Sequence, residues 1–230
     1  KEEIETLLKE VSKRNKTYAT HMRDEGNHLE ESVKETIKHA QNTGVRLQIS
    51  HHKAVGKDNY GKVKKTIPMI EEAREQIKVH TDMYVYNSAS TVLKALLPKE
   101  IIQSVEGNIN AIQNNKEYNN MQNVKGLQNM FRNNWEDVII SEHKNNLYIG
   151  KSILELKGKA TEEETYLQIL KEDSTSRAIY RNISSYEDIE TVIKQPFTII
   201  ASDGYLLDSK DKQFIHPRSY GTFAKFIKEY

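Results

Sequence analysis

The chain has 230 residues, and its 34 basic and 33 acidic side chains give a formal net charge of +1. This balance excludes a strong overall field for nucleic acid or an anionic membrane, and no basic stripe interleaved with aromatic residues is present. No apolar run approaches the roughly 20 residues that cross a bilayer, and no N-terminal signal pattern is visible. Cysteine is absent, which excludes disulfides and thiolate metal ligands and leads us to expect a cytoplasmic protein.

Both ends of the sequence indicate a piece of a longer protein. The first residue is Lys1, which already lies in a helical pattern, and residues 223–230 have the pattern of an unfinished helix. We therefore expect part of the protein to lie outside this chain.

Helices and short strands alternate regularly over the first 97 residues. Apolar residues at helical spacing mark the helices, and a glycine, Gly44, closes the second of them. The predicted order is helix 4–11, strand 17–20, helix 29–40, strand 45–50, helix 62–76 and strand 77–82. This alternation predicts parallel βαβ units.

The regular alternation stops after Pro98. Residues 107–134 are crowded with Asn and Gln, and we interpret them as polar helices of an insertion because several large apolar residues remain. Thr161 followed by three glutamates indicates the capped start of a helix. The further predicted elements are strand 138–140, helix 161–170, strand 178–180, helix 185–194 and strand 197–202.

These elements predict an α/β protein in three parts. Residues 1–97 form βα units, residues 98–195 form an inserted small α/β domain, and residues 196–230 supply a last strand, a loop and a helix. About four strands in parallel βα units are too few for a closed (β/α)₈ barrel. The pattern fits the last half of such a barrel.

Three predicted strands end in residues of the types that metal sites use: His21, His51 and Asp203. In parallel α/β folds the carboxyl ends of the strands meet at one edge, so these side chains can converge. Two imidazoles and a carboxylate suit zinc, which would polarise an amide carbonyl and activate water. A histidine at a strand end is more often hydrogen-bonded or solvent-facing than metal-bound, and this alternative stays open.

Five runs of the sequence resemble the D-aminoacylase (N-acyl-D-amino-acid deacylase) family of the amidohydrolase superfamily. They match the family in order and approximate spacing, and the resemblance covers most of the chain but is weakest between residues 100 and 175. Each run alone is weak evidence, whereas the set is specific. The runs are residues 18–26 (YATHMRDEG), 48–53 (QISHHK), 82–91 (DMYVYNSAST), 202–204 (SDG) and 216–223 (HPRSYGTF).

The resemblance implies a (β/α)₈ hydrolase that cleaves N-acyl-D-amino acids into a carboxylic acid and a free D-amino acid. By this match His21 and His51 are ligands of one tightly bound zinc ion. Asp203 is the general base and acid, and also a ligand of a second, weaker metal site. The family's remaining ligands, a His-x-His pair and a cysteine, would lie upstream of residue 1, so this chain alone is expected to bind zinc weakly and to be inactive.

The same resemblance implies a set of substrate contacts. Arg23 and Lys53 would favour a carboxylate substrate, Tyr84 and Ser90 would hold its acid end, and Arg218 belongs to a loop that closes over the site. The alternatives are that Tyr84 only covers the barrel top, that Lys53 is a solvated lysine and that the loop is structural.

Other readings of the sequence remain. The protein could be an amidohydrolase with another substrate, such as a dihydroorotase-like or dipeptide-cleaving enzyme. It could also be a non-catalytic fragment whose open strand edges drive self-association. The expected partners are a small N-acyl-amino-acid substrate and the missing N-terminal part of the same protein, and neither nucleic acid nor a membrane.

Overall fold

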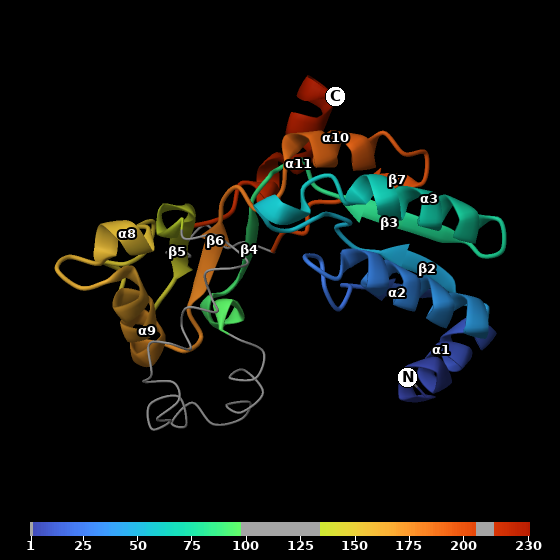
Figure 1. Ribbon diagram of the computed structural model, residues 1–230, viewed down its shortest axis with the longest axis horizontal. Coiled ribbons are helices and arrows are strands. Elements are labelled where there is room, and N and C mark those ends of the chain that lie inside the picture. Colours follow the sequence, from blue (N-terminus) through green and yellow to red (C-terminus); the bar gives the residue numbers. More distant parts are fainter. Residues whose placement is uncertain (1, 98–133, 206–213) are drawn as a thin grey trace. The chain divides into compact units, whose positions relative to one another are not determined.

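The computed structural model describes residues 2–97, 134–205 and 214–230 (Figure 1). The polar helices expected between residues 107 and 134 lie almost entirely outside these ranges. The chain divides into two compact units, which we treat separately. The first, here called the parallel unit, comprises Lys1–Asn87, Ser184–Tyr205 and Pro217–Tyr230; the second, the antiparallel unit, comprises Ser88–Ile183 and Leu206–His216.

A four-stranded parallel sheet organises the parallel unit. Its strands lie in the order β1-β2-β3-β7, and each pairs in parallel with its neighbour. The strands are β1 (Thr17–Thr20), β2 (Arg46–Ile49), β3 (Val79–Met83) and β7 (Thr198–Ile200). The α/β class and the parallel βαβ units predicted from the alternation are therefore confirmed.

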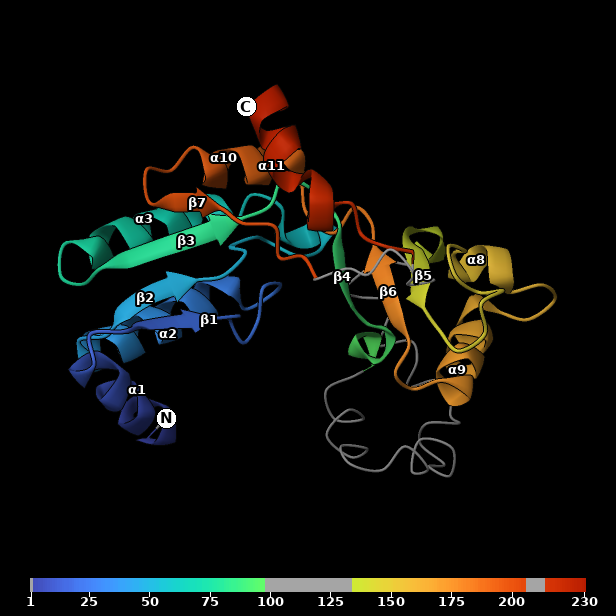
Figure 2. The same cartoon turned by 180° about the vertical axis from the view of Figure 1, so that it is seen from behind.

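The described residues of this unit form five α-helices: α1 (Glu2–Lys13), α2 (Leu29–Thr43), α3 (Val63–Arg74), α10 (Tyr186–Ile193) and α11 (Arg218–Glu229). Opposite views show α2 and α3 on the same face of the sheet (Figures 1 and 2). Gly44 ends α2 in the left-handed conformation at φ 67°, and its N–H donates to the Ala40 carbonyl. Glycine adopts this conformation without strain, which explains why the sequence signal for this helix end was reliable.

Alternation along the strands separates two faces of this sheet. Val79 and Met83 on β3 are buried in the same core as the apolar residues of α2 and α3. His80 on β3 is exposed, and Ile199 on β7 is 54% exposed. The core thus lies on the side of the helices, and the carboxyl ends of β1, β2 and β3 carry the residues that form the candidate site.

A three-stranded antiparallel sheet organises the other unit. Its order is β4-β6-β5, with β4 (Ala89–Val92), β6 (Arg177–Tyr180) and β5 (Val138–Glu142). In the described part of this unit two α-helices accompany the sheet, α8 (Ile153–Leu156) and α9 (Glu162–Glu172). Both begin with a capping box, Ser152 with Glu155 and Thr161 with Glu164. The second of these confirms the predicted helix start, whereas β4 and α8 had no prediction.

The predicted division at residues 97 and 195 remains a prediction. The compact units change at Asn87/Ser88 and at Ile183/Ser184, so β4 falls in the antiparallel unit and α10 in the parallel unit. Among the described residues, no helix combines the length and apolar character needed to cross a membrane.

Candidate metal centre

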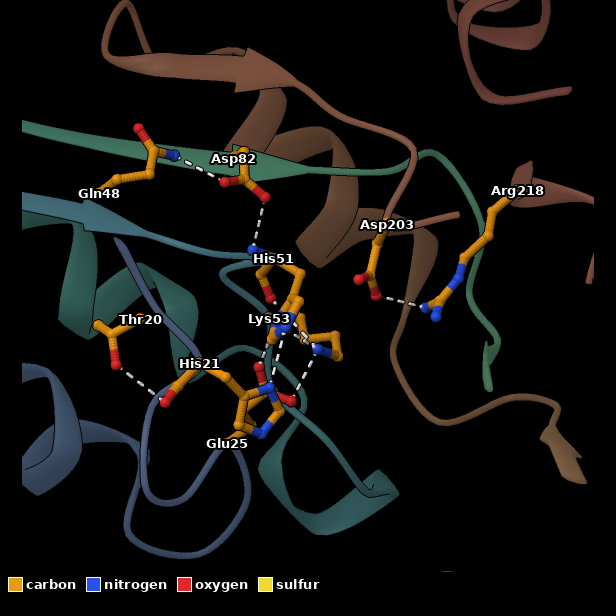
Figure 3. Close-up of polar contacts among 9 residues, drawn as sticks. All are labelled: Thr20, His21, Glu25, Gln48, His51, Lys53, Asp82, Asp203 and Arg218. Carbon is orange, nitrogen blue, oxygen red and sulfur yellow. Dashed lines mark hydrogen bonds and ion pairs between the residues drawn. The ribbon is translucent and has the colours of Figure 1, made fainter. Parts of the chain in front are cut away.

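Two histidines from neighbouring parallel strands face each other. His21 follows β1 and His51 follows β2, and their Nδ1 and Nε2 atoms lie 2.9 Å apart with the ring planes at 66° (Figure 3). Glu25, from the loop after His21, brings a carboxylate to the same place, and one ligand atom from each of the three lies within 4.8 Å of the others. Such a group has the composition of a divalent-metal site.

The distance between the two imidazole nitrogens is compatible with both of them binding the same metal ion. Zinc–nitrogen bonds of about 2.0–2.1 Å in a tetrahedron place two nitrogens about 3.3 Å apart, so a small opening of the pair admits the ion. Metal ligation also needs neutral imidazoles. Desolvation lowers the pKa of His21, although the negative charge of Glu25 opposes this shift. The lowered pKa favours the neutral imidazole.

A buried ion pair lies directly behind His51. Glu25 Oε1 lies 2.7 Å from His51 Nδ1, and Glu25 Oε2 lies 2.7 Å from Lys53 Nζ. Burial would raise the pKa of Glu25, but the charge of Lys53 and the hydrogen bond from His51 outweigh it and lower the pKa to about 2. Burial would likewise lower the pKa of Lys53, and the charge of Glu25 raises it instead. Both groups are therefore charged at neutral pH.

A strained backbone positions His51. Its φ is 39°, a region that few non-glycine residues adopt, and its N–H donates to Asp82 Oδ1 at 2.7 Å. Asp82 is held in turn by Gln48, whose Nε2 donates to Oδ2 at 2.7 Å. Strain of this kind persists where surrounding contacts over-determine it, and such places are often functional.

Asp203, beyond the end of β7, has the other positive φ at the candidate site, 48°. Its Oδ2 lies 2.7 Å from Nη1 of Arg218, which is buried. The Arg218 guanidinium stacks over the ring of Tyr84 at 4.7 Å, and the Lys53 ammonium lies 5.9 Å from the same ring centroid. The structure thus brings two predicted cationic residues, Arg218 and Lys53, against the buried ring of Tyr84, and pairs Asp203 with the first of them.

Not every predicted site residue joins these clusters. The candidate metal-binding group contains His21 and His51 but not Asp203, whose carboxylate is paired with Arg218. Arg23 is paired with Glu35 of α2 at 3.0 Å. Ser90 lies on β4 in the antiparallel unit. The roles proposed for these residues stay predictions.

Sequence reasoning missed Glu25 and Asp82 as parts of the site. Glu25 lies inside the run of residues 18–26, but a carboxylate in a loop after a strand looks like a solvated side chain. Asp82 was noted only within its own run, because its partner is a backbone N–H that no sequence pattern shows. The available signals were an acidic residue in the loop after the strand-end His21 and an acidic residue at the end of the predicted strand 77–82.

His52 points away from His51, as its place next in the chain predicted. It is fully buried, and its Nε2 is hydrogen-bonded to Thr66 Oγ1 of α3 at 2.8 Å. Its Nδ1 is buried with no hydrogen-bond partner among the described residues. Burial lowers the pKa of His52 to about 4, so it is neutral in the folded chain near neutral pH.

Acid is therefore expected to destabilise this chain through His52. The unfolded chain binds a proton at His52 below a pH of about 6.5, whereas the folded chain does so only below about 4. The free energy of unfolding should fall by about 3 kcal/mol as the pH drops through this window. Urea unfolding at several pH values measures this slope, which His52→Gln should reduce. The exposed His80→Gln is the matched control and should keep the slope, and an unchanged slope in His52→Gln would refute the assignment.

Comparisons with known proteins show sequence similarity to D-amino-acid deacylases. The chain is 26% identical over 235 residues to the D-aminoacylase of Alcaligenes xylosoxydans xylosoxydans, a match that covers 100% of this chain and 39% of that protein. It is 33% identical over 92 residues to the N-acyl-D-glutamate deacylase of the same organism, covering 40% of this chain and 19% of that protein. No family model matches the chain.

Solved structures give the same result for the fold. A crystal structure of D-aminoacylase matches with a TM-score of 0.72 and 26% identity, covering 97% of this chain and 39% of that chain. The N-acyl-D-glutamate deacylase of Bordetella bronchiseptica, complexed with zinc and a phosphonate inhibitor, also has a TM-score of 0.72, at 20% identity, covering 99% of this chain and 40% of that chain. This chain thus spans about two fifths of the length of the proteins it matches. The resemblance to D-aminoacylases is confirmed in sequence and in fold over nearly the whole of this chain.

Proposed function

We propose that this chain is part of a metal-dependent hydrolase that cleaves the amide bond of N-acyl-D-amino acids to give a carboxylate and a free D-amino acid. The observation that carries the proposal is the pair of imidazoles after β1 and β2, with facing nitrogens 2.9 Å apart, in a chain similar to D-aminoacylases. The relatives' names supply the substrate class, and the geometry supplies a place for the metal.

Zinc is the metal we propose. One similar structure contains zinc, and another is described by its binuclear metal center. His21 and His51 would hold the ion, and the remaining protein ligand would come from the part of the protein outside this chain. When bound, zinc supplies a Lewis acid for the amide carbonyl and lowers the pKa of water so that hydroxide forms near neutral pH.

Asp203 is the proposed general base and acid. It lies beyond the carboxyl end of β7, at the same edge of the sheet as the two histidines, and Arg218 holds its Oδ2. A carboxylate in this place takes a proton from water and returns it to the leaving amine. The proposed role as ligand of a second, weaker metal rests on the resemblance alone.

Arg218, Lys53 and Tyr84 are the proposed contacts of the substrate's carboxylate, together with Ser90 and Arg23. The first three support the proposal best, because two cationic groups lie against one buried aromatic ring. Arg offers a two-pronged hydrogen bond to a carboxylate. Lys53 is paired with Glu25 and Arg218 with Asp203, so each cation would share the substrate's negative charge with a carboxylate of this chain.

The parallel unit is the proposed last half of a (β/α)₈ barrel, and the antiparallel unit is the proposed insertion before the last strand. Fully parallel sheets are normally buried on both faces, yet exposed His80 and Ile199 lie on strands of this sheet. Closure into a barrel with strands from outside this chain would bury such residues. The predicted ranges 1–97, 98–195 and 196–230 belong to this proposal.

The isolated chain is expected to self-associate. Strands β1 and β7 form the two edges of the parallel sheet, and apolar side chains such as Leu7 and Ile227 are exposed. Open edges and apolar patches drive association. Size-exclusion chromatography with light scattering should show dimers or larger species that dilution dissociates, and a clean monomer at high concentration would contradict the prediction.

Activity on defined substrates tests the proposed function. The full-length protein, loaded with zinc, should release amino acid from N-acetyl-D-amino acids and leave the L-enantiomers largely intact. Strict preference for cyclic amides or dipeptides would favour the alternative of another amidohydrolase. The 230-residue chain alone, assayed in parallel, should be inactive.

The cytoplasmic location expected from the lack of cysteine stays a prediction, and cell fractionation measures it.

A further inference from the structure

We propose that Glu25 is a positioning residue of the metal centre, whose carboxylate keeps the proton of His51 on Nδ1 and so leaves the Nε2 lone pair for the metal. This inference rests on the proposed metal site. Glu25 is not one of the predicted metal ligands. On this proposal it determines whether His51 is in the tautomer that can bind a metal.

The first step is the contact itself. Glu25 Oε1 and His51 Nδ1 lie 2.7 Å apart, a short distance typical of a charge-assisted hydrogen bond, and the Glu25 side chain is only 10% exposed. His51 Nε2, on the other side of the ring, faces His21 Nδ1 at 2.9 Å. The two nitrogens of one imidazole therefore have different partners, one a carboxylate and one the proposed metal position.

The second step excludes the other tautomer. Lys53 Nζ lies 3.0 Å from His51 Nδ1, so an ammonium donor competes with the carboxylate for that nitrogen. If Nδ1 accepted from Lys53, its lone pair would face Glu25 Oε1 at 2.7 Å. An ionised carboxylate has no proton to give, so this arrangement is repulsive. The stable arrangement has Nδ1–H donating to Glu25, while Lys53 donates to Oε2 at 2.7 Å.

The third step separates positioning from ligation. Glu25 belongs by distance to the group that could hold a metal. Both of its oxygens already have partners, Oε1 with His51 and Oε2 with Lys53. A carboxylate on the far nitrogen of a metal-binding histidine fixes the ring orientation and raises the basicity of the ligand nitrogen, and losing it costs about 10–100-fold in metal affinity.

Glu25→Gln tests the proposal because Lys53 dictates how the new amide sits. An ammonium is only a donor, so the amide oxygen must face Lys53 and the amide NH₂ must face His51 Nδ1. Nδ1 then becomes an acceptor and the proton moves to Nε2. Nitrogen NMR of histidine-labelled 230-residue chain, without metal, should show the His51 proton on Nδ1 in the wild type and on Nε2 in the variant. Zinc affinity of the full-length protein should fall about 10–100-fold.

A second substitution distinguishes positioning from general damage. In the double variant Glu25→Gln with Lys53→Met, the amide is free to turn its oxygen back to Nδ1, and zinc affinity should recover. Glu30→Gln is the matched control, since Glu30 also pairs with a lysine, Lys65 at 3.2 Å, away from the histidines. It should change neither the tautomer nor the affinity.

The outcomes are decisive even if a variant fails to fold. A wild-type His51 that carries its proton on Nε2 overturns the proposal without any substitution. So does a folded Glu25→Gln variant with wild-type zinc affinity. Absence of zinc from the wild-type full-length protein would instead contradict the proposed function. The tautomer measurement on the 230-residue chain would still test the role of Glu25 independently.

Discussion

On the proposed function, His51→Ala and His21→Ala are each expected to abolish tight zinc binding by the full-length protein and to lower kcat/KM by about a thousandfold or more. Each variant removes one of the two imidazoles that face each other at 2.9 Å. A catalytic zinc site normally has three protein ligands, so losing one leaves too few to hold the ion. The lost Lewis acid is worth several kcal/mol in the barrier, and about 4 kcal/mol is a thousandfold in rate.

Metal analysis after dialysis measures the first effect, and steady-state kinetics with an N-acetyl-D-amino acid measures the second. His28→Ala is the matched control, because His28 is exposed just before α2, its side chain makes no capping hydrogen bond, and it lies outside the candidate metal-binding group. It should keep both metal and activity. Equal metal content in the wild type, His21→Ala and His51→Ala would remove the ligand assignment.

Lys53→Met is expected to lower the free energy of unfolding of this chain by about 3–5 kcal/mol. The Lys53 and Glu25 side chains are 5% and 10% exposed, and their charged atoms lie 2.7 Å apart. Removing the ammonium leaves a carboxylate buried without its counter-charge, and that uncompensated charge accounts for most of the loss. Urea unfolding at neutral pH, followed by circular dichroism, measures the change.

Two controls show whether burial causes this loss. Lys64→Met breaks an ion pair of similar length, 2.6 Å to Glu187, whose side chains are 55% and 74% exposed. Exposed pairs contribute little, so Lys64→Met should cost far less than Lys53→Met. The double variant Glu25→Gln with Lys53→Met removes both charges and should recover most of the stability. Equal losses in Lys53→Met and Lys64→Met would contradict the role of burial.

Local sequence signals were sufficient for the secondary structure that carries the site. The apolar spacing of α2 and its end at Gly44 are short-range properties, since helix periodicity and a left-handed glycine depend on neighbours in the chain. The parallel pairing of β1, β2 and β3 followed from their alternation with helices. His21 and His51 were therefore found from sequence, because parallel strands bring their carboxyl ends to one edge.

The antiparallel unit contains a strand, β4, that local sequence signals did not predict. Strand β4 has four residues, and its place beside β6 depends on pairing with a segment about ninety positions away, as in Ser90 with Ile179. A short strand has little periodicity of its own, so the partner rather than the local sequence determines it.

By itself, then, the sequence determined the α/β class, the strand ends and the two histidines after them, because these depend on local periodicity and on the parallel sheet it implies. Only the tertiary structure decided what each side chain does there. It placed Glu25 and Lys53 behind His51, Asp82 on the His51 backbone, and Arg218 on Asp203. These partners come from loops and strands distant in sequence, and charges meet in a buried place only when the folded chain excludes water around them.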